Sequence, residues 1–203
     1  GAISEEQVVI TGKDVNHIKN VLRMKVGEEI AVSNGVDGRE YRCGILQMTE
    51  DAVICELRFI KEDGVELPSK IYLFQGLPKA DKMELIIQKA VELGVYEIVP
   101  VATKRAVVKL DAKKEEKKRL RWQSIAESAA KQAGRALIPQ VAPCMNFDKA
   151  LRMCNGLDAA LIPYEKAEGM QHARDQVRAL HGKHSIGIFI GPEGGFEESE
   201  IEA

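Results

Sequence analysis

The sequence predicts an α/β protein in two parts: a small β-rich domain over residues 1–67 and a larger domain over residues 68–203 that is built on a mostly parallel sheet. Short, partly alternating apolar segments separated by turn residues fill the first part, whereas strand and helix patterns alternate after residue 70. The length of 203 residues suits one large domain or two small ones.

The first part opens with one expected helix, near residues 14–21, in which Asp14 can act as the N-cap residue. Three β-rich segments follow, at residues 29–33, 40–46 and 52–59. Turn pairs separate them: Asn34-Gly35, Asp37-Gly38 and Glu50-Asp51. Several short strands joined by tight turns indicate a small barrel. Residues 62–68 are polar and end at Pro68, which is typical of a linker.

The second part contains four apolar segments with the pattern of buried strands, at residues 71–75, 97–101, 158–162 and 186–190. Helical patterns lie between them, at residues 83–91, 122–133 and 168–180. Gly94 and Gly134 follow the first two helices, where a left-handed glycine often ends a helix. Strands that alternate with helices indicate a parallel sheet covered on both faces.

Charge is unevenly distributed along the chain. The formal net charge is −2, yet residues 70–140 contain 15 Lys and Arg against 8 Asp and Glu, a net of +7, and the remainder has a net of −9. A basic middle can bind a polyanion such as nucleic acid. The alternative is a solvated helix face, since a charge run such as residues 113–121 usually faces water.

The composition also bounds the cellular setting. No apolar run approaches the ~18 residues that a membrane span needs, and the N-terminal residues have no secretory pattern. The four cysteines form no C-x-x-C pair and lack the spacing of a zinc site, which favours reduced, mostly buried thiols. We therefore expect a cytoplasmic protein with no membrane segment and no metal.

Residues 186–196 form the most informative segment, because a buried strand runs into Gly191-Pro-Glu-Gly-Gly195 and then into the start of a helix. Ligands of open α/β sheets bind beyond the carboxyl ends of strands. The loop has neither the P-loop nor the G-x-G-x-x-G pattern. Glu193, Glu197 and Glu198 would repel a phosphate, so a neutral or cationic ligand fits better. The alternative is a tight turn with a helix cap.

Basic side chains follow several of the predicted elements. Lys79 and Lys82 lie in a second strand-loop-helix segment, and Arg105 follows the strand at residues 97–101. Arg135 lies at the end of a long helix, where a cation also complements the helix dipole. Each can bind RNA phosphate, or be an ordinary surface cation. We interpret His181 and His184 as loop residues, and no nucleophile-base set has supporting context.

Seven motifs in order resemble one known family. They are His17-x-x-x-Val-Leu-Arg23, Gly76-Leu-Pro-Lys-x-Asp-Lys82, Gln88-Lys-Ala-Val-Glu-Leu-Gly94, Lys104-Arg105 followed by Val-Lys-Leu110, Arg121-Trp122-x-x-Ile125, Gln132-x-x-Gly-Arg135-x-x-x-Pro139 and Ile190-Gly-Pro-Glu-Gly-Gly-Phe196-x-x-x-Glu200. The chain resembles, over nearly its whole length, the 16S ribosomal RNA uridine-N3 methyltransferases of the SPOUT superfamily, the RsmE type.

The resemblance implies a PUA-like β-barrel followed by a SPOUT α/β domain with a trefoil knot. It implies S-adenosylmethionine as the methyl donor, a homodimer, no metal, and one uridine of 16S rRNA in the small ribosomal subunit as the substrate. We expect the cofactor pocket to be lined by Leu77, Pro78, Gly191, Pro192, Glu193, Gly194 and Gly195. The RNA candidates are Arg23, Lys79, Lys82, Arg105 and Arg135. No catalytic residue or general base is assigned.

Two further functions stay open on the sequence. One is a SPOUT methyltransferase that acts on another RNA, and the other is a non-catalytic RNA-binding or ribosome-assembly protein with the same fold. Family members usually continue past the last motif into a segment that threads the knot and closes the cofactor pocket. Since the printed sequence stops at Ala203, we expect that segment to lie outside it.

Overall fold

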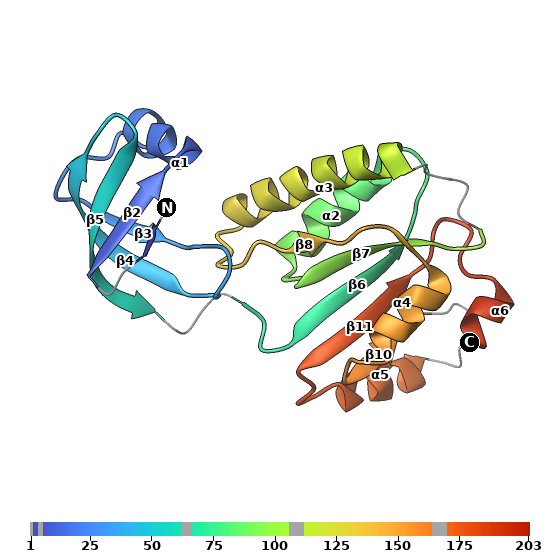
Figure 1. Cartoon of the computed structure of the whole chain (residues 1–203). Coiled ribbons are helices and arrows are strands. Elements are labelled where there is room, and N and C mark those ends of the chain that lie inside the picture. Colours follow the sequence, from blue (N-terminus) through green and yellow to red (C-terminus); the bar gives the residue numbers. More distant parts are fainter. Residues whose placement is uncertain (1, 4–5, 62–65, 106–111, 164–169) are drawn as a thin grey trace. The chain divides into compact units, whose positions relative to one another are not determined.

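A computed structural model of the chain describes residues 2–3, 6–61, 66–105, 112–163 and 170–203. The chain divides into two compact units, Gly1–Val65 (unit 1) and Glu66–Ala203 (unit 2), both drawn in Figure 1. Most of the predicted linker, at residues 62–65, lies outside the described residues. Among the helices that the structure describes, none is long and apolar enough to pass through a lipid bilayer.

Unit 1 is a five-stranded antiparallel sheet with the strand order β1-β2-β5-β4-β3. Its strands are β1 (Ala2–Ile3), β2 (Gln7–Thr11), β3 (Glu29–Val32), β4 (Glu40–Met48) and β5 (Ala52–Lys61). The predicted strands are confirmed as β3, β4 and β5. Strands β1 and β2 were not predicted, because β2 is fixed by pairing with the distant β5, where Gln7 lies opposite Glu56.

A short helical segment follows β2, as α1 (Lys13–Asn16) and a π-helical turn, η1 (His17–Val21). The predicted helix near residues 14–21 is therefore confirmed, but the N-cap role of Asp14 is wrong. Asp14 lies inside α1, and Gly12 occupies the N-cap position without a side-chain hydrogen bond. The φ angle of Gly12 is +75°, a conformation that glycine adopts at little steric cost and that turns the chain out of β2.

The core of unit 1 forms where alternate residues of its strands meet the helical segment. Its buried side chains come from β2, β4, β5, α1 and η1: Val8, Ile10, Val15, Ile18, Tyr41, Cys43, Ile45, Val53 and Cys55. Burial raises the pKa of the Cys43 thiol to about 11, so this thiol stays protonated at neutral pH. All four cysteines are free thiols, and three of them are buried, as predicted.

Unit 2 contains a parallel sheet in which every described strand pair is parallel. The strand order is β10 (Ala159–Leu161), β11 (Ser185–Ile190), β6 (Lys70–Gly76), β7 (Glu97–Ala102) and β8 (Gln140–Val141), and β9 (Met145–Asn146) also pairs with β7. The predicted parallel sheet and its four strands, β6, β7, β10 and β11, are confirmed. The two-residue strands β8 and β9 are too short to leave a sequence pattern.

Helices cover both faces of this sheet, as predicted. Figure 1 shows α2 (Lys82–Glu92) and α3 (Ala112–Gln132) on one face, and α4 (Phe147–Cys154) and α5 (Met170–Ala179) on the other. The last helix, α6 (Glu198–Ile201), lies beyond the carboxyl end of β11. Gly94 ends α2 with a φ angle of +98° and donates its N–H to the Val91 carbonyl, which confirms its predicted role.

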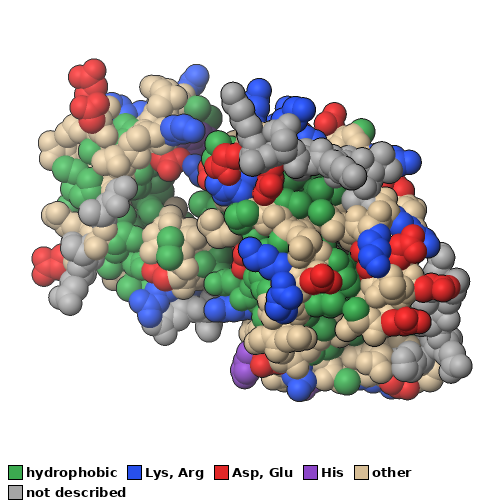
Figure 2. All heavy atoms as spheres, turned by 45° about the vertical axis from the view of Figure 1, so that its right-hand side comes forward, with side chains coloured by type: hydrophobic (Ala, Val, Ile, Leu, Met, Phe, Trp, Pro, Cys, Tyr) green, Lys and Arg blue, Asp and Glu red, His purple; other side chains and the backbone are tan. Residues whose placement is uncertain are grey.

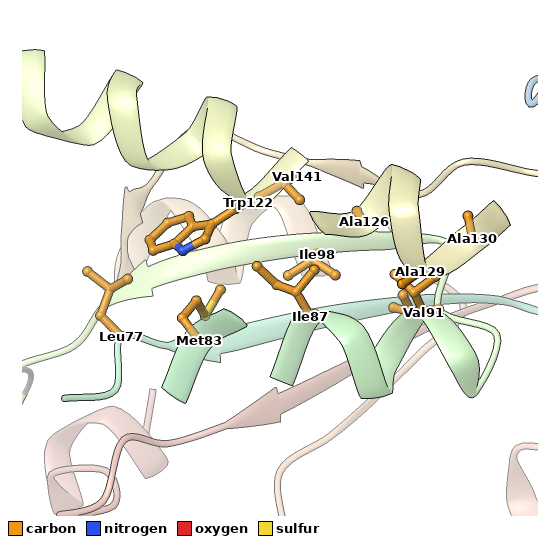
Figure 3. Packing of buried hydrophobic residues seen from close by; sticks show 11 residues of the cluster. Leu77, Met83, Ile87, Val91, Ile98, Trp122, Ala126, Ala129, Ala130 and Val141 are labelled. Carbon is orange, nitrogen blue, oxygen red and sulfur yellow. The ribbon is translucent and has the colours of Figure 1, made fainter. Parts of the chain in front are cut away.

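The core between α2, α3 and the sheet explains the helical spacing seen in the sequence. Figure 3 shows that Met83, Ile87 and Val91 of α2 point toward Trp122, Ala126 and Ala130 of α3. Small residues on α3 let the two helices approach closely, and Trp122 fills the space at the end near Leu77 and Met83. This packing fixes α2, and therefore the loop that leads into it.

The core on the opposite face is aromatic. Phe74 and Phe189 stack with ring centroids 4.4 Å apart, and Phe147 of α4 lies at an angle against Phe189, 5.8 Å away. Phe196, which follows the loop after β11, is buried against Phe147 at 5.7 Å. The far end of that loop is thereby anchored in the core of unit 2.

Candidate functional site

Three loops meet at the carboxyl ends of the central strands of unit 2. They follow β6 (residues 77–81), β7 (residues 103–105 as far as described) and β11 (residues 191–197). Because β6, β7 and β11 are parallel neighbours, their carboxyl ends lie at one edge of the sheet. This edge is the candidate site.

The loops after β6 and β11 are in direct contact at their first residues. A Cβ atom on Gly76 would lie 2.7 Å from the ring of Pro192 and 2.9 Å from its backbone nitrogen, so only glycine fits there. The buried Gln75 side chain donates a hydrogen bond of 2.9 Å to the Gly76 carbonyl, with the Ile190 and Gly191 carbonyls at 3.5 Å. The backbone at this edge is therefore held closely on both strands.

Glu193 joins the two loops through its carboxylate. Its Oε1 atom lies 2.8 Å from Lys82 Nζ, and both of its oxygens accept from the backbone N–H of Lys79 at 3.2 Å. The hydrogen bond from Lys82, together with the backbone hydrogen bonds, lowers the pKa of the Glu193 carboxyl to about 2. We call this contact the Glu193 clasp.

Arg105 joins the loop after β7 to the loop after β11. Its Nη1 atom donates to the Gly194 carbonyl at 2.7 Å, and its Nε atom donates to Glu197 Oε1 at 2.9 Å. The Arg105 guanidinium lowers the pKa of the Glu197 carboxyl, first through this hydrogen bond and then through its charge. We call this contact the Arg105 clasp.

The start of α6 is also bound to the loop after β7, through Lys104. The backbone N–H of Lys104 donates to Glu200 Oε1 at 2.9 Å, and Lys104 Nζ donates to Ser199 Oγ at 2.8 Å. Glu197 and Glu200 also form a reciprocal capping box at the first turn of α6. Glu200 is 2% exposed, which is rare for a carboxylate, and it is satisfied by these backbone donors.

These contacts correct one step of the sequence argument. The acidic residues of the loop were expected to repel phosphate, but Glu193 is compensated by Lys82 at the start of α2, and Glu197 by Arg105 of the loop after β7. Their negative charge is therefore largely neutralised at the site. The predicted start of a helix after Phe196 is confirmed as α6.

Thr103 is a buried residue at this edge that sequence reasoning missed. Thr103 follows β7 and is 7% exposed. Its Oγ1 atom has no hydrogen-bond partner in the part of the chain that the structure describes. Of the next two residues, Lys104 binds Glu200 of α6 and Arg105 binds Gly194 of the loop after β11, so Thr103 lies close to the segment that follows β11. A buried hydroxyl without a partner costs about 1–3 kcal/mol, which a ligand can recover.

The structure brings the predicted cofactor residues together at this edge, but some of them are buried and others are exposed. Leu77, Pro78 and Pro192 are buried, and Leu77 packs into the core between α2 and α3. Glu193 and Gly194 are exposed, whereas Gly191 and Gly195 are partly exposed. The φ angle of Gly195 is +67°, and its N–H donates to the Pro192 carbonyl at 2.8 Å in a tight turn.

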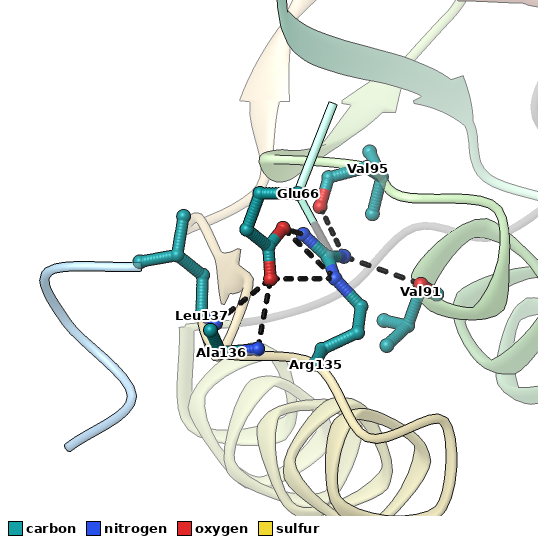
Figure 4. Close-up of polar contacts among 6 residues, drawn as sticks. All are labelled: Glu66, Val91, Val95, Arg135, Ala136 and Leu137. Carbon is teal, nitrogen blue, oxygen red and sulfur yellow. Dashed lines mark hydrogen bonds and ion pairs between the residues drawn. The ribbon is translucent and has the colours of Figure 1, made fainter. Parts of the chain in front are cut away.

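Arg135 has a structural position, which corrects its selection as an RNA candidate. Its side chain is 5% exposed and pairs with Glu66. Its Nη1 atom donates to the Val95 carbonyl at 2.6 Å and to the Val91 carbonyl at 3.2 Å. Figure 4 shows the guanidinium enclosed by these groups. Because its donors are bound within unit 2, Arg135 does not belong to an RNA-binding surface.

The remaining RNA candidates are exposed. Lys79 lies on the loop that leads into α2, Lys82 is the first residue of α2, and Arg105 binds the loop after β11, so these three border the same edge. Arg23 lies in unit 1, is exposed, and has a φ angle of +54°. Over unit 2, the face in Figure 2 shows Lys and Arg side chains beside Asp and Glu side chains.

His181 and His184 lie away from the candidate site. They precede β11, whereas the site lies beyond the carboxyl end of that strand. The backbone N–H of His184 donates to Asp158 at 2.7 Å, and its carbonyl accepts from the backbone N–H of Lys70 at 2.8 Å. They are loop residues at the amino-terminal edge of the sheet.

Comparisons with known proteins place this geometry in a family. Residues 65–203 match the model of an RNA methyltransferase domain, and residues 10–58 match that of an RNA methyltransferase PUA domain. The chain is 40% identical over 196 residues to the ribosomal RNA small subunit methyltransferase E of Bacillus subtilis, over 95% of this chain and 76% of that protein. This chain belongs to the methyltransferase E family. The family inferred from the seven motifs is therefore confirmed.

Other members of the methyltransferase E family support the same assignment. The Mesomycoplasma hyopneumoniae enzyme is 32% identical, over 98% of this chain and 81% of that protein. A crystal structure of the Neisseria gonorrhoeae enzyme bound to S-adenosyl methionine has a TM-score of 0.79 at 28% identity, and covers 100% of this chain and 81% of that one. The α/β methyltransferase domain with a PUA domain is thus confirmed, and the trefoil knot stays a prediction.

Proposed function

We propose that this chain transfers a methyl group from S-adenosylmethionine to N3 of one uridine in the 16S rRNA of the small ribosomal subunit. The family membership supports the reaction class, and the names of the relatives support the small subunit as the substrate. Two solved structures of similar methyltransferases, from Neisseria gonorrhoeae and Legionella pneumophila, contain S-adenosylmethionine. We also propose a cytoplasmic homodimer, in line with the family expectation.

The observation that carries the proposal is the loop of residues 191–197, which two clasps hold at the carboxyl edge of the sheet beside the hydroxyl of Thr103. The residues present fit S-adenosylmethionine. Gly194 and Gly195 leave room for a ligand to approach the backbone, whereas Gly191 lets the loop pack against Gly195 and Phe196. The Thr103 hydroxyl offers one free hydrogen bond. Leu77 and Pro78 contribute through their backbone, since their side chains are buried.

When bound, the cofactor supplies an electrophilic methyl group on a sulfonium. The residues of this chain then have three tasks. They hold the loop of residues 191–197, which we call the cofactor loop, in one position, and they keep the uracil in line with the methyl group. They also stabilise negative charge on the uracil oxygens as N3 loses its proton. The side chains of Arg105 and Lys82 each pair with a carboxylate of the loop, and we propose them for the last task. Because N3 lies on the pairing edge, the target base must be unpaired during the reaction.

Methyl transfer tests the function directly. Small ribosomal subunits from cells that lack the enzyme are incubated with the protein and S-adenosylmethionine, and N3-methyluridine is mapped along 16S rRNA by mass spectrometry. We expect one new N3-methyluridine. No transfer, or transfer to a different atom or a different RNA, would overturn the proposal.

Thr103 tests the cofactor site separately. We expect Thr103→Val to weaken the binding of S-adenosylmethionine about five- to tenfold in calorimetry, because the ligand loses one hydrogen bond. The free energy of unfolding should not fall, since the unbound protein loses only an unpaired hydroxyl. Thr103→Ser keeps the hydroxyl and should bind the cofactor nearly as the unmodified protein does. Equal affinities for all three would exclude a contact at this residue.

A further inference from the structure

A basic pocket lies beside the candidate site, between the first residues of α2 and the first half of α3. It has a volume of about 320 Å³. The α3 side of the pocket carries four cations and one aromatic side chain: Lys114, Lys117, Lys118, Arg121 and Trp122. The opposite side is formed by Ala80, Asp81 and Glu84. We call it the α3 groove.

The cations of the groove form a row because of the helical repeat. Positions 114, 117, 118 and 121 follow the helical spacing i, i+3, i+4 and i+7, so their side chains lie on one face of α3. From Lys114 to Arg121 the helix axis rises by ~10 Å at 1.5 Å per residue. A row of this length is suited to successive phosphates of one nucleic acid strand rather than to one small anion.

The charge of the groove is positive after its acids are counted. Arg121 is compensated, because its Nε atom lies 2.7 Å from Glu84 Oε1 and its Nη2 atom donates to Glu84 Oε2 at 3.0 Å. Asp81 is the second acid of the lining, so four cations face two acids and a net charge of +2 remains in the groove. These lysines are exposed, so they can bind phosphate groups without a large desolvation cost.

The groove is continuous with the candidate site through one loop. Ala80 and Asp81 line the groove, and the neighbouring Lys79 donates its backbone N–H to Glu193 on the cofactor loop. The floor of the groove is firm, because Trp122 is 5% exposed and packs beside Leu77 and Met83 (Figure 3). An RNA strand in the groove would therefore pass next to the proposed methyl-transfer site.

We propose that the α3 groove binds the sugar-phosphate backbone of the substrate RNA, next to the nucleotide that is methylated. This proposal rests on the proposed function, since it takes the RNA substrate as given. It assigns the charge run of α3, which the sequence analysis left between a solvated face and a polyanion site, to RNA. The contact involves backbone phosphates, so it contributes affinity and orientation rather than sequence specificity.

The test removes two charges from the groove and two from a matched surface. The test variant is Lys117→Gln with Lys118→Gln on α3, and the control is Lys149→Gln with Arg152→Gln on α4, whose exposed side chains lie on the opposite face of the sheet. For each protein, the dissociation constant for small ribosomal subunits that lack the modification is measured over a range of KCl concentrations. The dissociation constant for S-adenosylmethionine is measured alongside by calorimetry.

We expect the groove variant to bind subunits about tenfold more weakly at ~0.1 M salt, and its plot of log affinity against log salt to be shallower by about one to two. Its cofactor affinity should be unchanged. The control variant should match the unmodified protein in both measurements. Equal RNA affinity and salt dependence for all three proteins would overturn the proposal, and so would equal losses in the two variants.

Failure of the proposed function leaves a different signature. If the unmodified protein binds subunits but transfers no methyl group to 16S rRNA, the function is wrong whatever the groove variant does. If the unmodified protein methylates the subunits and the groove variant binds them equally well, only the groove proposal fails. Inorganic phosphate could also shift the NMR signals of α3 while the groove variant binds RNA as tightly as the unmodified protein. That result would assign the groove to small anions and would also overturn the RNA proposal.

Discussion

The Arg135–Glu66 pair and the Arg105–Glu197 pair join the same two chemical groups in opposite surroundings. The first pair is buried, with side chains 5% and 14% exposed, and Glu66 also accepts from the backbone N–H groups of Ala136 and Leu137 at 2.9 and 3.0 Å. The second pair lies at the candidate site, with side chains 43% and 44% exposed. Water surrounds the second pair and is largely excluded from the first.

The difference separates stability from function. A buried charge that loses its partner stays desolvated, so breaking such a pair is costly. An exposed pair is screened by water and adds little to stability, but it can hold a loop in one position. We therefore expect Arg135 to contribute to the stability of the fold and Arg105 to contribute to ligand binding at the candidate site.

The largest expected effect is on stability, from Arg135→Met. The substitution leaves the carboxylate of Glu66 without its cation and the Val91 and Val95 carbonyls without their donor. We expect the free energy of unfolding to fall by about 3–5 kcal/mol. Denaturant unfolding followed by the fluorescence of Trp122, which lies in the core of unit 2, measures this change.

The matched control for that experiment is Arg105→Met, which makes the same substitution in an exposed ion pair. Its denaturation midpoint should stay within experimental error of the unmodified protein, because its partner Glu197 becomes hydrated. A loss in Arg105→Met as large as that in Arg135→Met would abolish the distinction between the two pairs. An unchanged midpoint in Arg135→Met would do the same.

The second prediction concerns ligand binding, where the order of the two pairs is reversed. Arg105 binds both Gly194 and Glu197, so Arg105→Met frees the loop that we propose to contact the cofactor. Because a mobile loop must be ordered on binding, we expect the affinity for S-adenosylmethionine to fall about three- to tenfold. Isothermal calorimetry measures the dissociation constant.

Arg121→Met is the control for this effect, since it breaks another exposed pair, with Glu84, that does not involve the cofactor loop. Its cofactor affinity should equal that of the unmodified protein. If both variants lose affinity equally, the effect arises from the loss of surface charge, and the loop-holding role of Arg105 is wrong.

The sequence could predict the fold because its elements depend on local patterns. The strands of unit 2 are short apolar segments, and α2 and α3 have apolar residues at helical spacing, so both are visible without knowledge of their partners. The strand β2 was missed because its register depends on β5, and Asp14 was misplaced because the chain turns at Gly12 instead. Long-range pairing and backbone turns are the parts that a local pattern does not contain.

The site could be predicted only in part, for a related reason. The loop with Gly191, Gly194 and Gly195 is visible because strand, glycines and helix are adjacent in the sequence. The partners of its carboxylates come from 92 to 114 residues away, as in Arg105 to Glu197 and Lys79 to Glu193. The burial of Arg135 by Glu66, 69 residues away, is likewise invisible in the sequence. The motifs thus select the two loops that meet at this edge, but they do not contain the contacts that join them.

The smallest expected effect is on a single pKa, in the other exposed clasp of the site. Lys82 holds the pKa of the Glu193 carboxyl at about 2, against an ordinary value of 4.5, so Lys82→Met should raise it toward 4.5. The hydrogen bonds from the Lys79 N–H and from the backbone of Glu193 remain, so the rise should be partial. The chemical shift of the Glu193 side-chain carboxyl carbon, followed by NMR as a function of pH, gives the midpoint.

The direction of the pH dependence follows from the lowered pKa. A carboxyl with a depressed pKa in the folded state stabilises that state above its unfolded value of 4.5, and this contribution is lost as the pH falls through about 2. In Lys82→Met the difference between the folded and the unfolded pKa of Glu193 should become smaller, so the pH range over which this contribution is lost should narrow. The stability at neutral pH should change little, because the pair is exposed. Lys89→Met, which breaks the exposed pair with Glu92 elsewhere on α2, should leave the Glu193 midpoint unchanged. A Glu193 midpoint near 2 in Lys82→Met would show that the backbone donors alone hold the charge, and the exposed cation would then have no part in the clasp.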